Sequence, residues 1–236
     1  MKIKFFYLVF FLFPHLFAFT ASPLFHAIIA EKWLAAFEDY NEEDKQAFFL
    51  GTLFPDIRYS AGLPRTATHE PGFTLEEIRA IQDPFLKGMR VHVFVDEERE
   101  IFFSKQKALH FYDAIPGDRV LHLKFLEDEI LYSMRGEVAP LYISNYLQHI
   151  DKSELKFNIP LEILQNWHQL NKDYLSMRPS NALAKLIASH RGYANISVAI
   201  TQVSYEVMCQ FRENPQAVEY VSSAIAEFDK IFSYGH

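Results

Sequence analysis

Apolar residues recur at helical spacing through most of the chain. Between residues 24 and 40 they fall on one face of a predicted helix, at Phe25, Ile28, Ile29, Trp33, Ala36 and Phe37. Similar patterns predict helices near 42–50, 84–103, 117–130, 140–150, 160–175, 181–189, 194–211 and 215–232, and Thr74 with Glu76 and Glu77 predicts one more helix start. No two segments show hairpin chemistry. The pattern therefore predicts an all-α fold, a single-domain multi-helix bundle of eight to ten helices.

The segment 54–72 interrupts the helical pattern. It contains three prolines and two glycines, and few apolar residues at periodic positions. We expect a long ordered loop there.

The first 21 residues differ from the rest of the chain. Lys2 and Lys4 precede the apolar run Phe5–Phe19, and small residues follow it, as in a secretory signal peptide. A helix formed by the apolar run Phe5–Phe19 would span about 22 Å, less than the ~30 Å hydrocarbon core of a bilayer. We expect a signal peptide at 1–21 and an exported mature domain at 22–236 with no stable membrane span. An uncleaved anchor and a buried N-terminal helix are the alternatives.

Composition and charge argue against some classes of protein, such as broad nucleic-acid binders and disulfide-linked domains. The chain has 236 residues, of which 50% are hydrophobic, enough for one domain with a sizeable core. The formal net charge of −7 argues against a broad surface for the phosphate backbone of a nucleic acid. Cys209 is the only cysteine, which excludes an internal disulfide and a cysteine-based zinc finger.

Residues suited to metal binding gather in the first half of the chain. Asp56 stands in GTLFPDI, His69 in ATHEPG, and His92 and Asp96 in GMRVHVFVDEERE, while His26 lies upstream in HAIIAEKWL. Taken singly, each has a common structural role in a turn, on the surface or in the core. Together, three imidazoles and two carboxylates are enough for a site that binds zinc.

The pair His92 and Asp96 carries the strongest local signal. Residues four apart in a helix project from the same face and can share an ion. Gly88 lies one turn earlier on that face, where its missing side chain leaves room for a ligand or for a neighbouring helix.

The order of these motifs resembles the zinc-dependent phospholipase C / S1–P1 nuclease superfamily. The segments HAIIAEKWL, FFLGTLFPDI, TH and FLKGMRVHVFVD carry the resemblance, over about residues 22–103. It implies an all-α fold of the phospholipase C / P1 nuclease type with a cluster of up to three zinc ions.

The resemblance also implies ligand roles. Asp56, His69, His92 and Asp96 would surround one zinc, and His26 would hold a second, with Asp96 bridging the two. In that family the free amine of the mature N-terminal residue is a further ligand, and cleavage near residues 20–22 would create such an amine a few residues before His26.

The downstream half of the family pattern is incomplete. EEREIFF follows Asp96 where the family has another histidine, and Leu126 stands four residues after His122 where the family has a carboxylate. We keep His122 as a candidate metal ligand; the other candidates on this side are His110, Glu127, Asp128 and Glu129. The expected number of zinc ions is therefore between one and three.

These features predict an exported zinc-dependent phosphodiester hydrolase, similar to phospholipase C, that uses a metal-activated water. Asp56 would be the catalytic residue that orients or deprotonates this water. The expected substrate is a phospholipid or another phosphodiester. One alternative is a non-catalytic exported helical protein with a structural or vestigial metal site. A second is an S1/P1-like nuclease, although the net charge makes a nucleic acid the less favoured partner.

Overall fold

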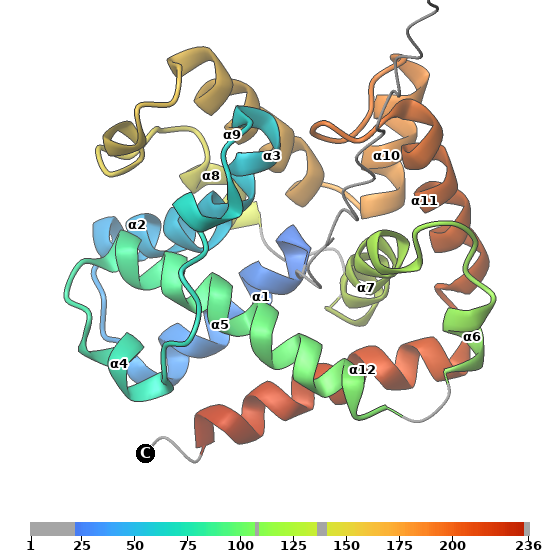
Figure 1. The fold of residues 1–236 in the computed structure, drawn as a ribbon, viewed down its shortest axis with the longest axis horizontal. Helices are drawn as coiled ribbons and strands as arrows, with labels where there is room; N and C mark the ends of the chain where they lie inside the picture. Colours follow the sequence, from blue (N-terminus) through green and yellow to red (C-terminus); the bar gives the residue numbers. More distant parts are fainter. Residues whose placement is uncertain (1–21, 107–108, 136–140, 234–236) are drawn as a thin grey trace, which may run out of the picture.

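The computed structural model describes residues 22–106, 109–135 and 141–233 (Figure 1). Within these residues it contains helices and no strand, which confirms the all-α prediction. The α-helices are α1 (Pro23–Phe37), α2 (Glu42–Leu53), α3 (Arg58–Ala61), α4 (Leu75–Ala80), α5 (Pro84–Ser104), α6 (His110–Asp113), α7 (Arg119–Arg135), α8 (Leu141–Tyr146), α9 (Leu161–Leu175), α10 (Pro179–Ala188), α11 (Val198–Phe211) and α12 (Pro215–Ser233). Three 3-10 helices are η1 (Phe54–Ile57), η2 (Arg65–Ala67) and η3 (Glu154–Phe157).

Helix α1 lies at the centre of the fold. It contacts α2, α5, α7, α9 and α12, and nearly all of its first eight residues are buried (Figure 1). Trp33 and Phe25 are fully buried and pack edge-on against aromatic rings of α12. Burial of this many large apolar side chains, at ~25 cal/mol per Å² of apolar surface removed from water, holds the surrounding helices to α1.

Helices α2 and α5 meet backbone to backbone at two glycines. A Cβ atom at Gly51 would lie 2.0 Å from the carbonyl oxygen of Phe85, and one at Gly88 would lie 2.1 Å from that of Phe48. No side chain fits at either position. The space at Gly88 is thus filled by the neighbouring helix, and this close approach brings the second half of α2 against the first turns of α5.

The N-terminus of α1 is capped from α7 and not by its own sequence. Ser22 makes no side-chain cap bond to the helix. The buried carboxylate of Asp128 instead accepts the backbone N–H groups of Leu24 (3.1 Å) and Phe25 (2.9 Å), together with the hydroxyl of Ser22. Burial raises the pKa of Asp128 to about 7, although these hydrogen bonds favour its charged form.

The prediction of a loop at 54–72 is only partly correct. The segment contains η1, α3 and η2, and Gly62 ends α3 in the left-handed region at φ 66°. Helices of three or four residues are too short to show a 3.6-residue period, so the apolar pattern did not reveal them. Such short helices also take the number of α-helices in the described chain above the eight to ten expected.

The predicted signal peptide at 1–21 lies outside the described residues. None of the helices in the described part of the chain is both long enough and apolar enough to cross a membrane.

Candidate metal centre

Five of the six predicted metal-binding residues come together beside α1. His26 comes from α1, Asp56 from η1, His69 from the turn after η2, and His92 and Asp96 from α5. Two overlapping groups, His26 with Asp56 and His92, and His69 with His92 and Asp96, each offer one ligand atom per residue within 4.8 Å of one another. All are buried except Asp56, whose side chain is 13% exposed.

Four of these residues form a compact set of donor atoms. His92 Nε2 lies 3.2 Å from His69 Nε2, 3.5 Å from Asp96 Oδ2 and 3.9 Å from Asp56 Oδ1. His69 Nε2 lies 3.7 Å from Asp96 Oδ2 and 4.0 Å from Asp56 Oδ1. These are five of the six edges of a tetrahedron, and donors on a tetrahedral zinc ion lie about 3.3–3.6 Å apart. Three of the five edges are slightly longer than in a closed zinc site, and Asp56 and Asp96 do not share a converging group, so the set is open between the two carboxylates.

The orientation of His92 is fixed by α2. Its Nδ1 lies 2.8 Å from the carbonyl oxygen of Thr52, so Nδ1 carries the proton and donates it. The lone pair of the neutral ring is then on Nε2, which faces the other donors. A backbone carbonyl that holds the outer nitrogen of a histidine in this way is a frequent support of a metal ligand.

His69 is held by a similar chain of hydrogen bonds. The hydroxyl of Thr68 donates to the carbonyl oxygen of Pro55 at 3.0 Å, and it lies 2.8 Å from His69 Nδ1. Because that hydroxyl proton is already used, the hydroxyl accepts from Nδ1–H of His69. The Nε2 atoms of both histidines therefore present lone pairs to each other and to two carboxylates.

Burial keeps both imidazoles neutral. It lowers the pKa of His92 to about 4, helped by His26 and opposed by Asp96 and Asp56. It lowers the pKa of His69 further, helped by His92, Arg65, Arg58 and His26. Neutral imidazole is the form that binds a metal, so the site is ready for a cation at neutral pH.

His26 occupies a second position around the same carboxylate. Its Nε2 lies 3.4 Å from Asp96 Oδ1, while Asp96 Oδ2 faces His69 and His92. The ring of His26 stacks on that of His92, with centroids 3.8 Å apart and planes at 12°. Asp96 thus has one oxygen towards each side, which is the arrangement that a bridging carboxylate needs.

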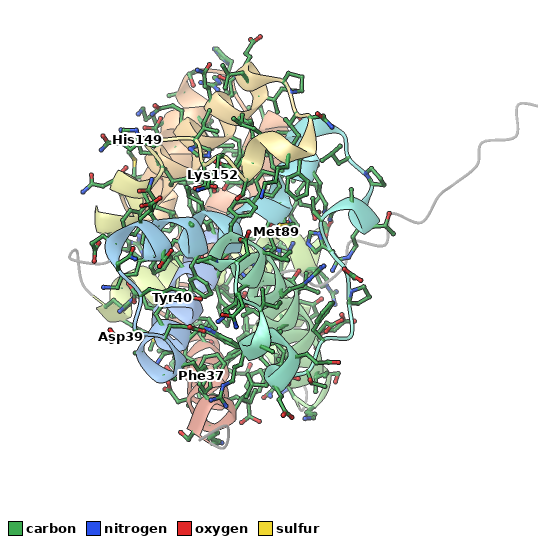
Figure 2. The ribbon with its side chains drawn as sticks, turned by 90° about the vertical axis from the view of Figure 1, so that its left-hand side faces the viewer. Phe37, Asp39, Tyr40, Met89, His149 and Lys152 are labelled. Carbon is green, nitrogen blue, oxygen red and sulfur yellow. The ribbon has the colours of Figure 1, made fainter. Side chains whose placement is uncertain are left out.

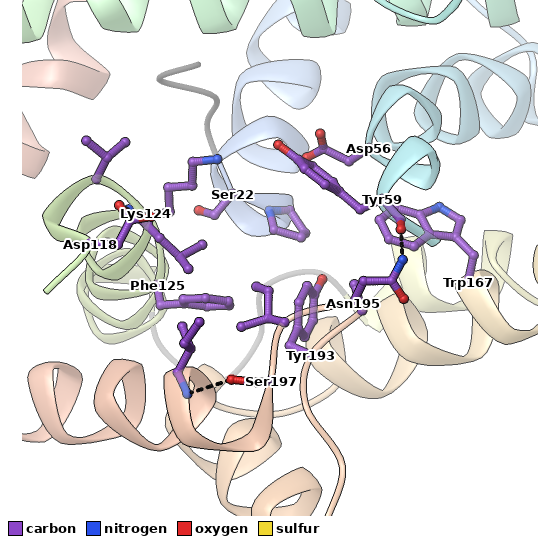
Figure 3. Close-up of a pocket in the computed structure, with 16 residues that line it drawn as sticks. Ser22, Asp56, Tyr59, Asp118, Lys124, Phe125, Trp167, Tyr193, Asn195 and Ser197 are labelled. Atoms are coloured by element: carbon purple, nitrogen blue, oxygen red, sulfur yellow. Dashed lines mark hydrogen bonds between the residues drawn. The ribbon is translucent and has the colours of Figure 1, made fainter. Parts of the chain in front are cut away.

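The cluster opens on one side into a cavity of about 420 Å³. Asp56 is the member of the cluster that lines it, and Asp56 Oδ1 is buried without a hydrogen bond from the described residues. Apolar and aromatic side chains form most of the wall, including those of Tyr59, Phe125, Trp167 and Tyr193 (Figure 3). A cavity of this size and character is typical of small-molecule sites.

Positive side chains approach the cluster from two sides. Arg65 Nη2 lies 3.7 Å from Asp96 Oδ2, and Lys124 of α7 lines the cavity together with Asp56. Burial lowers the pKa of Lys124, while the carboxylates of Asp56 and Asp96 raise it. Lys124 and Asp56 therefore place opposite charges on the wall of one cavity.

His122 is not brought to the other five residues. It belongs to neither group of converging donor atoms, and its Nδ1 lies 2.8 Å from the hydroxyl of Ser204 in α11. Burial lowers the pKa of His122, and Asp118 opposes this. No member of the cluster is among the charges that act on it.

The other downstream candidates have structural partners. Glu127 is fully buried against Arg99, at 2.7 Å from its Nη2. Asp128 caps α1, and Glu129 accepts the backbone N–H of Ser180 at 2.9 Å at the start of α10. His110 is exposed. The acidic residues of α7 therefore connect helices.

Comparison with protein-family models, with curated proteins and with solved structures found no match for this chain. The resemblance to the phospholipase C / S1–P1 nuclease superfamily therefore stays a prediction carried by its motifs.

Sequence reasoning missed Thr52, Thr68 and Lys124. The first two act through hydrogen bonds that exist only after the helices pack, so no local pattern marks them. Lys124 had no distinctive signal, because Val120 lies one turn before it but Glu127 and Asp128 lie one turn after it on the same helix face.

Proposed function

We propose that this chain is an exported zinc-dependent phosphodiester hydrolase of the phospholipase C-like kind. The observation that carries the proposal is the convergence of Asp56, His69, His92 and Asp96, with five donor separations of 3.2–4.0 Å and two imidazole lone pairs turned inward. Burying two carboxylates and two neutral imidazoles together is costly unless a cation joins them.

These four residues would hold one zinc ion, and His26 with the outer oxygen of Asp96 offers a place for another. Zinc at this position would act as a Lewis acid and lower the pKa of a bound water, which is the chemistry that phosphodiester hydrolysis needs.

Asp56 is the residue of the cluster best placed for a proton-transfer role. It lines the cavity and is partly exposed, whereas the other four residues are sealed from solvent. A carboxylate at the boundary between a buried centre and a cavity can orient a water molecule or accept its proton. Thr68 and Thr52 fix the imidazoles, so the chain would hold this geometry before substrate enters.

The cavity favours a phosphodiester with an apolar substituent over a nucleic acid. Its wall is mainly apolar and aromatic, and the chain carries a net charge of −7. A phospholipid fits both features. A nucleic acid needs a basic path for its backbone, which this charge balance does not favour.

A structural metal site is the second candidate. It is favoured by the burial of His26, His92 and Asp96 and by the use of the α7 acids as connections between helices. A structural zinc site is closed, whereas a catalytic one keeps an open position. The exposure of Asp56 to the cavity favours catalysis.

The test uses mature protein purified without a histidine tag. Zinc-loaded protein is assayed on phosphatidylcholine in mixed micelles and on single-stranded DNA, before and after chelation. We expect phospholipid hydrolysis that is lost with the chelator and restored by zinc, and that falls by about 10²-fold or more in Asp56→Asn with zinc still bound. Zinc-loaded protein that is inactive on both substrates would overturn the catalytic proposal and leave the structural one.

A further inference from the structure

Lys124 is placed at the junction between the cluster and the cavity. It projects from α7, is partly buried, and lines the cavity together with Asp56. Figure 3 shows the amine end of Lys124 and the carboxylate of Asp56 at the same end of the cavity, with Phe125 and Tyr193 on the opposite side. A group bound at that end can touch both the cluster and the amine.

The acidic residues of α7 and the residue before it, Asp118, have structural roles. Lys124, Asp56 and Asp118 are the charged residues that line the cavity, and Asp118 accepts the backbone N–H of Leu121 at 3.2 Å at the start of α7. The next three acidic residues of α7 are engaged elsewhere, Glu127 with Arg99, Asp128 with the N-terminus of α1, and Glu129 with α10.

Helix α7 therefore presents an ammonium group to the cavity, and its carboxylates point to other partners. The part of the chain that the structure describes offers no second set of converging donors on that side of the cluster. On that side of the cluster the side chain of Lys124 lines the cavity instead. Its amine end lies at the same end of the cavity as the carboxylate of Asp56, where an anion entering through the cavity would arrive.

We propose that Lys124 binds the anionic phosphoryl oxygens of a phosphate ester at the inner end of the cavity and adds a positive charge on the cavity side of the centre. The proposal rests on the proposed function for the reaction, since it names the residue that positions the phosphate beside the zinc site. The charges agree with it: one zinc ion would neutralise Asp56 and Asp96, and Lys124 together with Arg65 would add the positive excess that favours an anionic ester.

The matching ligand class is a phosphate ester with one apolar substituent. The ester's phosphate would lie between Lys124 and the cluster, and the substituent would extend along Phe125 and Trp167. Lysine acts here as a point charge, a common mode of phosphate binding.

The experiment measures binding of inorganic phosphate by calorimetry to the full mature chain, metal-free and loaded with one equivalent of zinc. The variants are Lys124→Gln, which removes the charge, and Lys124→Arg, which keeps it. Lys185→Gln, at an exposed position of α10, is the matched control. Zinc affinity is measured on the same samples, and far-UV circular dichroism confirms that each variant is folded.

We expect phosphate affinity to fall about tenfold or more in Lys124→Gln, to stay within about threefold of the parent in Lys124→Arg, and to be unchanged in Lys185→Gln. Zinc affinity should not fall in Lys124→Gln, because the variant removes a positive charge from the surroundings of the metal.

The outcomes separate the two proposals. Phosphate binding that is equally tight in the parent and Lys124→Gln overturns the role of Lys124, whether or not the protein is a zinc hydrolase. A chain that takes up no zinc overturns the proposed function, and Lys124-dependent phosphate binding by that metal-free chain would still support the anion site. A parent chain that takes up zinc but binds phosphate in neither form overturns the anion site and leaves the proposed function standing.

Discussion

The Nε2 atoms of His69 and His92 lie 3.2 Å apart with no proton between them. Each ring uses its Nδ1–H elsewhere, His69 on the hydroxyl of Thr68 and His92 on the carbonyl oxygen of Thr52. Two lone pairs at this distance repel each other, and the nearby carboxylates of Asp56 and Asp96 add further negative charge. A cation at their centre removes this repulsion, so metal binding and stability should be coupled.

Zinc should therefore stabilise the folded chain. A ligand that binds only the native state adds about 2.7 kcal/mol to the free energy of unfolding at a concentration 100 times its Kd. We expect zinc to raise the melting temperature of chelator-treated protein by several degrees, as measured by calorimetry. His92→Ala should lose this response, whereas His149→Ala, at an exposed bend after α8, should keep it (Figure 2). An equal response in both variants would place the zinc elsewhere.

The hydroxyl of Thr68 should support zinc affinity without touching the metal. Thr68→Val preserves the shape of the side chain but removes the donor to Pro55 and the acceptor for His69. We expect zinc affinity to fall about 10–100-fold, the usual effect of losing an outer hydrogen bond to a ligand. Competition with a chromophoric chelator measures it. Thr68→Ser, which keeps the hydroxyl, should bind within a few-fold of the parent; loss of affinity in Thr68→Ser as well would point to packing as the cause.

The glycine contact between α2 and α5 should be essential for the position of His92. Gly88→Ala places a Cβ atom 2.1 Å from the backbone oxygen of Phe48, which can only be relieved by moving a helix. We expect a loss of about 1–3 kcal/mol in the free energy of unfolding, or more, measured by urea denaturation. Zinc affinity should fall with it, because Thr52 would move away from Nδ1 of His92.

Glu100→Ala, at an exposed position of the same helix, is the control for helix α5. It should leave both quantities nearly unchanged. Normal stability in Gly88→Ala would contradict the close packing of the two helices.

The buried neutral histidines should make the metal-free chain sensitive to acid. The pKa of His92 is about 4 in the folded chain, below the ordinary value of 6.5, so the unfolded chain takes up a proton first as the pH falls. Stability that depends on neutral His92 is thus present above pH ~6.5 and lost progressively down to pH ~4. Asp128, with its pKa raised from 3.8 to about 7, contributes in the opposite direction across this range.

Comparison with His92→Gln isolates the histidine, because the contribution of Asp128 is common to both proteins. We expect the difference in free energy of unfolding between the parent and His92→Gln to shift in favour of His92→Gln as the pH falls from 6.5 to 4, by ~1.4 kcal/mol per pH unit at most. A difference that stays constant with pH would contradict the burial of a neutral His92.

The sequence predicted the positions that obey local rules. His92 and Asp96 share a helix face because they are four residues apart, and the motif order brought His26, Asp56 and His69 into the same set. The structure places these five residues beside one another, as the motif order predicted. Their role as zinc ligands stays a prediction. His122 shows the limit of such reasoning, since it was chosen by spacing and lies with Ser204.

What the sequence could not predict depends on tertiary packing. Thr52 contributes a backbone oxygen, and any residue at that position could have supplied it. Glu127 and Asp128 looked like possible ligands until their partners, Arg99 and the N-terminus of α1, were seen at distances of 28 and about 100 residues along the chain. Short helices such as α3 were not predicted, because four residues are too few to show a helical period in the apolar pattern.

The central claim is that Asp56, His69, His92 and Asp96 bind zinc, and metal analysis tests it most directly. The untagged mature chain is dialysed against zinc-containing buffer, freed of excess metal by gel filtration, and analysed for zinc per chain together with His92→Ala and His149→Ala. The account predicts at least one zinc per chain in the parent and in His149→Ala, and a loss of at least one equivalent in His92→Ala. A parent chain without zinc, or a His92→Ala variant with as much zinc as the parent, would contradict it.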